Sequence, residues 1–342
     1  SVHAIDNVGN VSVASSSDGI TVDLFEPMVG MPVEGLPGDL DYQGSPDTLA
    51  VFWPPSDEPQ LAFYEFSVGT IPGDSNTVEW INVGVDTNAV VTELSLDHAV
   101  TYYVSLRAFD LAGNRSVTAT SDGITVDLYP PITGVVIDGT TDDEQFTGSA
   151  TTLVASWSGF ADTVSGIQFY EYAVGTSPGA TDVKDWTSTG EDNTITDVSF
   201  SLEDEETYYV SVRVTDNVFN VSGIITTDGI TTDHTGPDGY WAVDGDSTDI
   251  DRQNYTDYYQ GYWSLFTDGI SGLNRHEYAL YDITDADYYL LWTDAGLDTS
   301  VVLTDLELTV DHVYQLHVRG VDSVENIGPT VISDGVLVDQ SA

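Results

Sequence analysis

The chain has 342 residues, of which 41% are hydrophobic, and its 57 Asp and Glu against 7 Lys and Arg give a formal net charge of −50. A surface this acidic attracts cations and repels nucleic acid and anionic membranes, and no apolar run approaches membrane-spanning length. We therefore expect no nucleic-acid partner and no membrane insertion within this chain. Cysteine is absent, which excludes disulfides and thiolate metal sites.

A short motif divides the chain into repeats of domain size. A segment that begins Ser/Thr-Asp-Gly and ends in Asp occurs four times, at 17–23, 121–127, 227–233 and 333–339. The intervals of 104, 106 and 106 residues between its Asp-Gly pairs predict tandem domains. Four copies of this ending accompany only three beginnings, so we predict repeats at 25–129, 130–235 and 236–342.

Residues 1–24 match the end of a repeat without its beginning, since 1–12 are similar to 211–222. We interpret them as the last two strands of an incomplete preceding repeat, in a piece of a longer array or a processed product. Two strands cannot bury a core alone. We therefore expect this segment to pair with an edge of the first repeat, with a neighbouring chain or with the missing part of its own domain.

The second repeat illustrates the predicted elements in chain order. Strands are expected at 134–139, 152–157, 167–174 and 195–202, with an acidic loop at 140–149 and two further strands towards the end of the repeat. Short strands between clusters of Gly, Pro, Asp and Ser favour an all-β sandwich. The joints between repeats are short, and Pro130-Pro131 and Gly236-Pro237 stiffen them.

Two apolar patterns identify the core of each repeat. From Tyr102, apolar residues occupy every second position through Ala108, and a Leu stands six residues before the Tyr. This period is typical of a half-buried strand. The same pattern recurs around Tyr208 and, less regularly, around Tyr314. Upstream, Leu-x-Val/Ala-x-Trp ends at Trp53 and at Trp157, and this predicts a facing strand with Trp in the core.

These two patterns together resemble the fibronectin type III family, and at the level of repeats the resemblance covers nearly the whole chain. It implies tandem immunoglobulin-like sandwiches of seven antiparallel strands in a linear array, with residues 1–24 as a strand F tail and strand G. The leading Tyr of each strand fits the tyrosine corner of such sandwiches. The resemblance implies little about function, because this fold carries many functions.

No catalytic constellation is evident in the sequence. Residues 175–179 spell G-x-S-x-G, but a nucleophile elbow requires a strand-to-helix turn, whereas the predicted flanks here are strands and the first repeat has Ile71 in place of the Ser. The His residues show no zinc-binding spacing, and His98 and His312 are expected in solvated turns. We predict that the chain is not an enzyme.

Carboxylates converge at the predicted joints between repeats. The last residue of one repeat's final strand should meet two loops of the next repeat, which groups Asp127 with Asp162 and Asp216, and Asp233 with Asp268 and Asp322. Oxygen ligands from several loops suit calcium, so calcium is the one cofactor that we expect. The competing interpretation is a solvated acidic surface on which these Asp residues cap turns. Second-choice ligands, at the opposite pole of each repeat, are Asp142, Asp143, Asp246 and Asp249.

Two other kinds of surface site are possible interpretations of the sequence. Asn10, Asn114, Asn220 and Asn254 begin Asn-x-Ser/Thr glycosylation signals, although the first three also fit ordinary turn chemistry. The third repeat is rich in Tyr and Trp, and Tyr258 and Tyr262 should point outwards if Tyr259 and Trp263 point inwards. Exposed aromatic rings could stack on sugars or on a neighbouring chain. Alternatively, Tyr simply suits a half-exposed strand.

Three hypotheses of function follow from these patterns. The first is a structural or adhesive extracellular array on a microbial surface, a semi-rigid stalk or filament component. The second is a module whose third repeat binds carbohydrate or protein. The third is a non-catalytic spacer of a large secreted enzyme. The expected partners are neighbouring repeats, copies of the chain itself, or a cell-surface or carbohydrate ligand.

Overall fold

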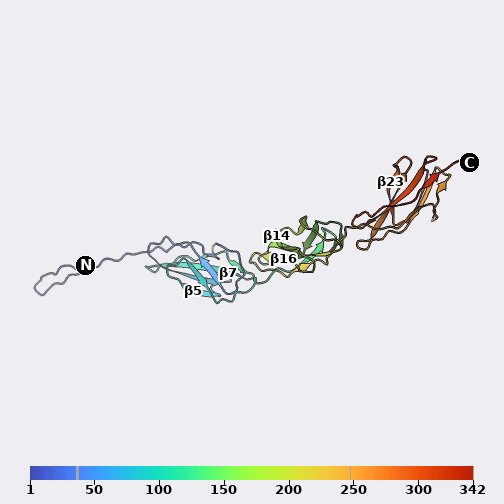
Figure 1. Cartoon of the computed structure of the whole chain (residues 1–342). Coiled ribbons are helices and arrows are strands. Elements are labelled where there is room, and N and C mark those ends of the chain that lie inside the picture. The colour runs from blue at the N-terminus through green and yellow to red at the C-terminus, as the bar shows by residue number, and fades with distance from the viewer. Residues whose placement is uncertain (36–37, 247, 342) are drawn as a thin grey trace. The chain divides into compact units, whose positions relative to one another are not determined.

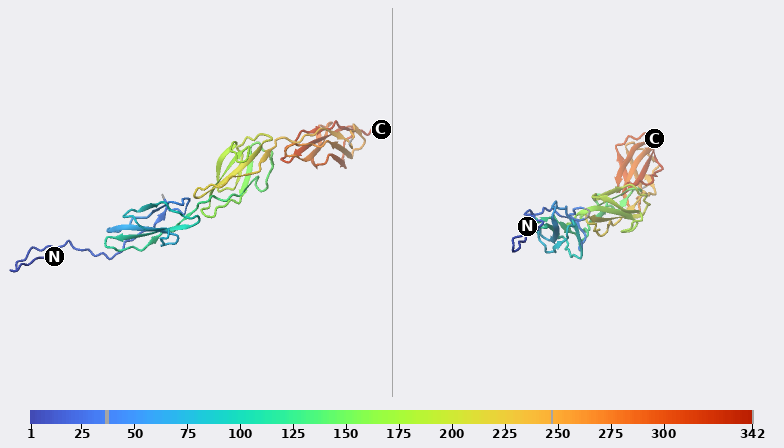
Figure 2. Two further views of the ribbon diagram at one scale, coloured as in Figure 1. Left: turned by 90° about the horizontal axis from the view of Figure 1, so that it is seen from below. Right: turned by 90° about the vertical axis from the view of Figure 1, so that its left-hand side faces the viewer.

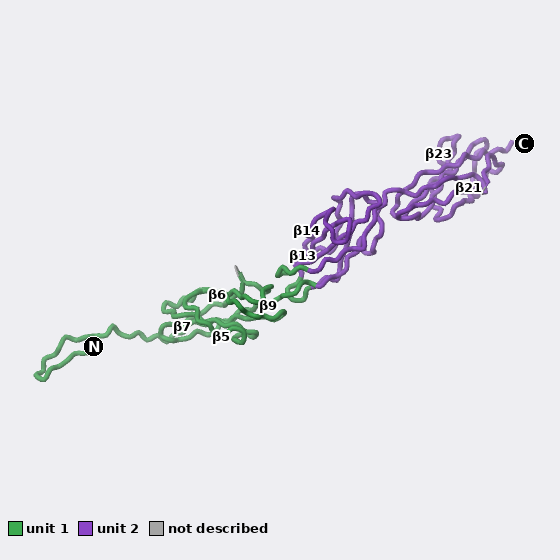
Figure 3. Tube along the Cα trace, turned by 60° about the horizontal axis from the view of Figure 1, so that its bottom comes forward, with its two compact units in different colours: residues 1–131, 162–166, 216–221 green, residues 132–161, 167–215, 222–342 purple. Residues whose placement is uncertain are grey.

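The structure is a computed structural model that describes residues 1–35, 38–246 and 248–341. Within these ranges all regular secondary structure is β-strand, drawn as arrows in Figure 1. The chain divides into two compact units, shown in different colours in Figure 3. The first unit contains residues 1–131, 162–166 and 216–221, and the second contains 132–161, 167–215 and 222–342.

Each predicted repeat contains a three-stranded sheet and a six-stranded sheet, and Figure 2 shows their strands as layered ribbons. In the first repeat the small sheet has the order β1 (Val33–Glu34), β3 (Leu49–Phe52), β6 (Asn88–Val91). Its large sheet has the order β2 (Tyr42–Gln43), β9 (Ile124–Val126), β7 (Thr101–Asp110), β4 (Leu61–Gly69), β5 (Val78–Asn82), with β8 (Ala119–Thr120) also on β7.

The other two repeats have the same topology. The small sheets are β10 (Val135–Asp138), β12 (Leu153–Ser158), β15 (Thr194–Asp197), and β19 (Ala242–Asp244), β21 (Tyr258–Trp263), β24 (Ser300–Thr304). One large sheet is β11 (Phe146–Thr147), β18 (Ile230–Thr232), β16 (Thr207–Asp216), β13 (Ile167–Gly175), β14 (Lys184–Gly190), with β17 (Ile225–Thr226) on β16. The other is β20 (Arg252–Gln253), β27 (Val336–Val338), β25 (Val313–Asp322), β22 (Leu273–Asp282), β23 (Asp287–Gly296), with β26 (Val331–Ile332) on β25.

These sheets confirm the predicted sandwich and add one detail to it. The strand pairs are antiparallel except for one short parallel pair in each large sheet, namely β2–β9, β11–β18 and β20–β27. The predicted strand 195–202 ends early, at Asp197, because the Asp197 carboxylate accepts hydrogen bonds from the backbone and hydroxyl groups of Ser199 and turns the chain. The exact bounds of the domains stay a prediction.

Three hydrophobic cores form where the sequence predicts them, one in each repeat. Trp53, Trp157 and Trp263 are at most 3% exposed, which confirms their expected place. The tyrosine corner is also present in every repeat. The hydroxyl oxygens of Tyr102, Tyr208 and Tyr314 each accept a backbone N–H from the residue five positions upstream, at 2.9 Å.

Within the part of the chain that the structure describes, no β-bridge joins residues 1–24 to an edge strand of the first repeat, so this alternative from the sequence is wrong. Their β-bridges, Val2 to Ser15 and Ile5 to Val11, lie within the segment itself. The Asp6 carboxylate accepts hydrogen bonds from the backbone and the side chain of Asn10, and these bonds close a local turn. The segment therefore satisfies part of its own backbone hydrogen bonding while its apolar side chains stay exposed.

Candidate functional site

Three carboxylates gather in the first unit as the sequence predicts. Asp127 follows β9, Asp162 lies between β12 and β13, and Asp216 ends β16. One oxygen from each carboxylate lies within 4.8 Å of the others. Asp127 and Asp216 are fully buried and Asp162 is half-buried, so these are not three freely solvated surface charges.

The second unit contains an equivalent cluster of Asp233, Asp268 and Asp322, with the same spacing and the same order of burial. Burial alone would raise the pKa of Asp233, but hydrogen bonds from Ser271 and Thr235 hold it below its usual value. Asp233 is therefore ionised at neutral pH. We name Asp127, Asp162 and Asp216 the first joint cluster, and Asp233, Asp268 and Asp322 the second joint cluster.

Local turns position the loop carboxylates. The Asp162 Oδ1 atom accepts the backbone N–H groups of Val164, Ser165 and Gly166 at 2.8–3.0 Å. Asp268 caps its loop in the same way, with bonds from Ile270 and Gly272. These bonds explain why Asp recurs in such turns. They use one oxygen of each loop Asp and leave the position of the carboxylate fixed beside its two neighbours.

An asparagine joins each cluster to the backbone of the segment between repeats. The Asn220 side-chain amide donates to Asp216 Oδ2 at 2.8 Å and to the backbone oxygens of Asp127 and Tyr129 at 3.4 and 3.3 Å. Two other residues repeat this arrangement: Asn114 with Asp110, Asp23 and Phe25, and Asn326 with Asp322, Asp233 and Thr235. We call each such Asn a joint asparagine.

The joint asparagines change the interpretation of the predicted glycosylation signals. Asn114 and Asn220 use their amide nitrogens to hold the chain between repeats, and Asn10 uses its amide on Asp6. Asn254 is exposed, as is Asn10. Turn chemistry therefore accounts for the first three positions, and glycosylation of any of the four stays a prediction.

Of the second-choice ligands, Asp143 lies in a cluster, but with two carboxylates that sequence reasoning missed, Asp138 and Asp228. Asp142, Asp246 and Asp249 are exposed. A corresponding group in the first repeat contains Glu34, Asp39 and Asp122. The available signal was the recurring Asp of the Asp-Gly motif, which supplies both Asp122 and Asp228.

His98 and His312 are less solvated than the sequence predicts. His98 Nδ1 lies 3.5 Å from Asp127 Oδ1, beside the first joint cluster. His312 Nδ1 lies 2.8 Å from Asp282 Oδ2. The hydrogen bond to Asp282 raises the pKa of His312. For Asp282, burial opposes ionisation, but the hydrogen bond from His312 helps to hold its pKa below the usual value.

The outer face of β21 carries the predicted aromatic surface. Tyr258 and Tyr262 are half-buried, whereas Tyr259 and Trp263 are fully buried, which confirms the alternation. Tyr258 lines a hollow of about 490 Å³. The other residues around this hollow are Tyr255, Asp257, Thr304 and Asp305. Tyr262 packs against Trp241 instead, with ring centroids 5.3 Å apart.

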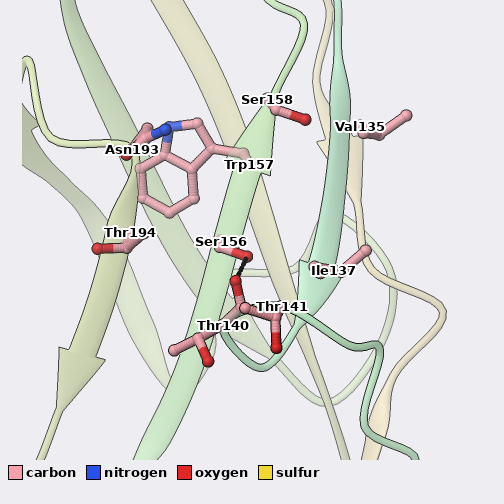
Figure 4. A pocket seen from close by; sticks show the side chains of 9 residues that line it. All are labelled: Val135, Ile137, Thr140, Thr141, Ser156, Trp157, Ser158, Asn193 and Thr194. Carbon is pink, nitrogen blue, oxygen red and sulfur yellow. Dashed lines mark hydrogen bonds between the residues drawn. The ribbon is translucent and has the colours of Figure 1, made fainter.

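A second hollow, of about 290 Å³, lies over β10, β12 and β15 in the second repeat (Figure 4). Hydroxyl groups and the Trp157 ring line much of it, and the Ser156 hydroxyl donates to the Thr140 backbone oxygen at 3.1 Å. Its lining, as far as the structure describes it, contains no acid, base or imidazole. It therefore offers neither general acid–base chemistry nor a charged metal ligand.

The G-x-S-x-G segment forms a plain turn between β13 and β14. The backbone N–H of Ala180 donates to the Ser177 backbone oxygen at 3.0 Å, and Gly179 has a φ of +80°. Because strands stand on both sides, the strand-to-helix geometry of a nucleophile elbow is missing at this segment. In the described part of the chain, no helix is long and apolar enough to cross a membrane.

Comparisons with known proteins agree with this fold. No protein-family model matches the chain. Exoglucanase B of Cellulomonas fimi is 28% identical over 255 residues, which are 72% of this chain and 21% of that protein. The chain thus spans about a fifth of the length of this curated relative.

Among solved structures, a 1.5-MDa bacterial ice-binding adhesin matches 93% of this chain and 100% of its own, with 16% identity and a TM-score of 0.50. The FN1–FN3 domains of chicken CNTN1 match 90% of this chain and 96% of their own, with 13% identity and a TM-score of 0.35. The adhesin match shows a shared fold. Together with the sheet topology, it shows that the chain has the fold of tandem β-sandwiches of the immunoglobulin-like, fibronectin type III-like kind.

Proposed function

We propose that the chain is a structural or adhesive repeat region of a larger extracellular protein, a semi-rigid stalk or filament component whose joints bind calcium. The observation that carries this proposal is the pair of equivalent joint clusters. Each takes its first Asp from the end of one repeat, and its other two from a loop and a strand end of the next repeat. A cation held there contacts two consecutive repeats and restricts their relative motion.

Charge repulsion supports a cation at these clusters. Two carboxylates about 4 Å apart repel by roughly 4 kcal/mol at an effective dielectric of about 20, and each joint cluster contains three carboxylates within 4.8 Å. Dissolved monovalent salt screens exposed charges over about 8–10 Å, but it does not fix a joint. Calcium takes six to eight oxygen ligands, including backbone carbonyls, and offsets the repulsion while ordering the loops.

The test compares the full chain in EDTA and in millimolar calcium at constant ionic strength. We expect calcium to raise the melting temperature, because it binds the folded form, and to narrow the distribution of dimensions measured by small-angle scattering. Asp162→Asn should weaken the calcium effect, since Asn retains the turn-capping oxygen but loses the charge. Asp192→Asn, at an exposed acid outside the clusters, is the matched control.

Three outcomes would contradict calcium at the joints, two of them seen with the unaltered chain. One is an identical melting temperature and scattering profile in EDTA and in calcium. The other is full restoration by sodium alone, which would make the acidic surface a solvated coat. A loss of the calcium response in Asp192→Asn equal to that in Asp162→Asn would point to diffuse binding rather than to a joint site.

The similarity to part of Exoglucanase B supports a closely related role, that of a non-catalytic spacer in a secreted enzyme. In that role the repeats separate other domains and themselves have no activity. The sequence on either side of this chain in the parent gene discriminates between the two: catalytic domains favour the spacer, and further repeats favour the surface array.

A binding role for the third repeat is a second candidate, and the hollow beside Tyr258 favours it. Tyr255 is 59% exposed, so two aromatic rings and two carboxylates are available to a sugar. Glycan-array binding that disappears in Tyr258→Ala supports this role. Equal binding by Tyr258→Ala and the unaltered chain counts against it.

A further inference from the structure

One buried carboxylate stands at the end of the first strand of each repeat: Glu34, Asp138 and Asp244. All three are 0% exposed. Their register is the same, since each lies opposite the residue two positions before the core Trp of the facing strand, in the pairs Glu34–Val51, Asp138–Ala155 and Asp244–Gly261. Acidic residues are almost never fully buried unless they are paired, because leaving water without compensation is costly.

In the third repeat the protein itself satisfies this carboxylate. Asp244 Oδ1 accepts hydrogen bonds from the Tyr259 hydroxyl and, at 2.8 Å, from the Ser333 hydroxyl. Asp244 Oδ2 accepts the Gly335 backbone N–H at 2.8 Å. Both oxygens therefore have partners within the repeat.

In the second repeat the equivalent carboxylate lacks such partners. Both oxygens of Asp138 are buried and accept no hydrogen bond. The position of Tyr259 is occupied by Leu153, which is apolar and 1% exposed. Thr227 and the Gly229 backbone N–H stand in place of Ser333 and Gly335 and lie near Asp138, but no hydrogen bond of ordinary geometry joins either of them to its carboxylate.

In the first repeat the equivalent carboxylate, that of Glu34, has hydrogen-bond partners on only one of its two oxygens. Glu34 Oε1 accepts hydrogen bonds from the Ser121 hydroxyl and, at 3.3 Å, from the Val104 backbone N–H. Glu34 Oε2 is buried and has no partner. Leu49 occupies the position of Tyr259 here.

Two exposed carboxylates face each of these under-satisfied groups. Asp143 and Asp228 each bring an oxygen within 4.8 Å of an Asp138 oxygen, and Asp39 and Asp122 do the same for Glu34. The exposed residues come from two separate loops in each repeat, one after the first strand and one at the Asp-Gly motif. Three carboxylates at this spacing repel one another, and they do so around oxygens that already lack partners.

We propose that the first and second repeats each bind a divalent, oxygen-preferring cation such as calcium, at Glu34, Asp39 and Asp122, and at Asp138, Asp143 and Asp228. The third repeat replaces that cation with the Tyr259 hydroxyl. Hard cations take carboxylate oxygens from several loops, and the exposed acids leave a path for entry. These sites share no residue with the joint clusters, and within one repeat they tie the first strand to the Asp-Gly turn.

The first test locates the ions directly. Crystals of the full chain grown with terbium, which substitutes for calcium and scatters anomalously, should give a peak beside Asp138 and another beside Glu34. No peak is expected beside Asp244. Absence of both peaks overturns the proposal, and so does an equal peak beside Asp244. Peaks at Asp127 or Asp233 test the joint clusters separately. The experiment therefore distinguishes failure of the present proposal from failure of calcium binding at the joints.

The second test counts bound calcium in solution by equilibrium dialysis of full-chain variants. Asp228→Asn removes one exposed ligand of the second-repeat site, and the chain should lose about one bound ion. The matched control is Asp334→Asn, which changes the equivalent exposed Asp of the third repeat and should leave the count unchanged. Unchanged calcium in Asp228→Asn overturns the proposal, as does an equal loss in both variants.

A substitution that gives Asp138 a hydrogen-bond donor provides the converse experiment. Leu153→Tyr gives the second repeat the residue that satisfies Asp244 in the third, and it should remove about one bound calcium. Because a larger ring changes the packing of the core, the melting temperature of the variant in EDTA is measured alongside. A folded Leu153→Tyr chain that binds as much calcium as the unaltered chain contradicts the proposed exchange of cation for hydroxyl.

Discussion

The pairing of His312 with Asp282 shows how single ionisable residues contribute to the stability of a chain with so few Lys and Arg side chains. The two side chains lie 2.8 Å apart and are mostly buried, with 17% and 8% of each exposed. Their pKa values move in opposite directions, that of His312 upwards and that of Asp282 downwards. Each group is therefore more readily charged in the folded chain than in the unfolded chain.

This pair predicts a bell-shaped dependence of stability on pH. The contribution of His312 is fully present below its unfolded pKa, about 6.5, and is lost as the pH rises through its folded pKa. The contribution of Asp282 is present above its unfolded pKa, about 3.9, and is lost as the pH falls through its folded pKa. The pair should therefore stabilise most near pH 5.

Calorimetric melting of the full chain and of His312→Gln, in EDTA, measures this effect. We expect the variant to melt at a lower temperature near pH 5 and at nearly the same temperature at pH 9. His3→Gln, in the exposed N-terminal segment, is the control and should match the unaltered chain at both values. A difference that is the same at pH 5 and pH 9 would show that the loss comes from packing rather than from charge.

At the scale of strands, each repeat places one Arg of its large sheet in the same recurring arrangement. The guanidinium of Arg213 on β16 bonds Glu171 on β13 at 2.8 Å and lies 4.3 Å from the Trp186 ring on β14. Arg107 and Arg319 make the same contacts in the other repeats. This arrangement ties three neighbouring strands of the large sheet together on its outer face, where no hydrophobic core supports them.

The sequence predicts the sandwich and the joint clusters but not this arrangement, for a physical reason. Repeat spacing and strand order determine which loops meet, so the sequence alone was enough to place Asp127 and Asp162 in one cluster. The contact of Arg213 with Trp186 depends on the register of β13 and β14, which shifts at Tyr170–Glu171. Glu34 and Asp138 were not predicted as site residues, because in a sequence a carboxylate at a strand end is indistinguishable from a solvated loop residue. Only tertiary packing buries it.

The strand that carries Trp157 allows a prediction for the core of one repeat. Trp157 is 3% exposed and lies in the core cluster of the second repeat. Trp157→Ala should lower the free energy of unfolding of that repeat by about 3–5 kcal/mol, because it removes apolar contact and leaves a cavity. Chemical denaturation of the full chain measures this loss, with hydrogen exchange as the readout that assigns it to one repeat.

An exposed apolar residue of the same repeat serves as the comparison for Trp157. Val198 is 69% exposed, so Val198→Ala should change the free energy of unfolding by no more than about 0.5 kcal/mol. A Trp157→Ala chain as stable as Val198→Ala would contradict the place of Trp157 in the core.

At the scale of the whole molecule, the structure contains connections between repeats that do not depend on a cation. The joint asparagines provide such a connection, since each donates to two backbone oxygens of the segment between repeats. The three share one position in the repeat and differ from the carboxylates in being neutral. They hold the backbone without adding to the net charge of −50.

Removal of a joint asparagine should therefore loosen its joint independently of calcium. In Asn220→Ala the backbone oxygens of Asp127 and Tyr129 lose a donor, and the Asp216 carboxylate loses one of the bonds that orient it. Each such bond contributes about 0.5–1.5 kcal/mol, so the chain between the repeats should open more often. We expect faster amide exchange in residues 127–133 and unchanged exchange in the core strand β16.

Asn254→Ala, at an exposed position, is the control and should leave amide exchange in both regions unchanged. The faster exchange in Asn220→Ala should appear in EDTA as well as in calcium. If exchange accelerates only in calcium, Asn220 acts by orienting Asp216 as a ligand and not by holding the joint.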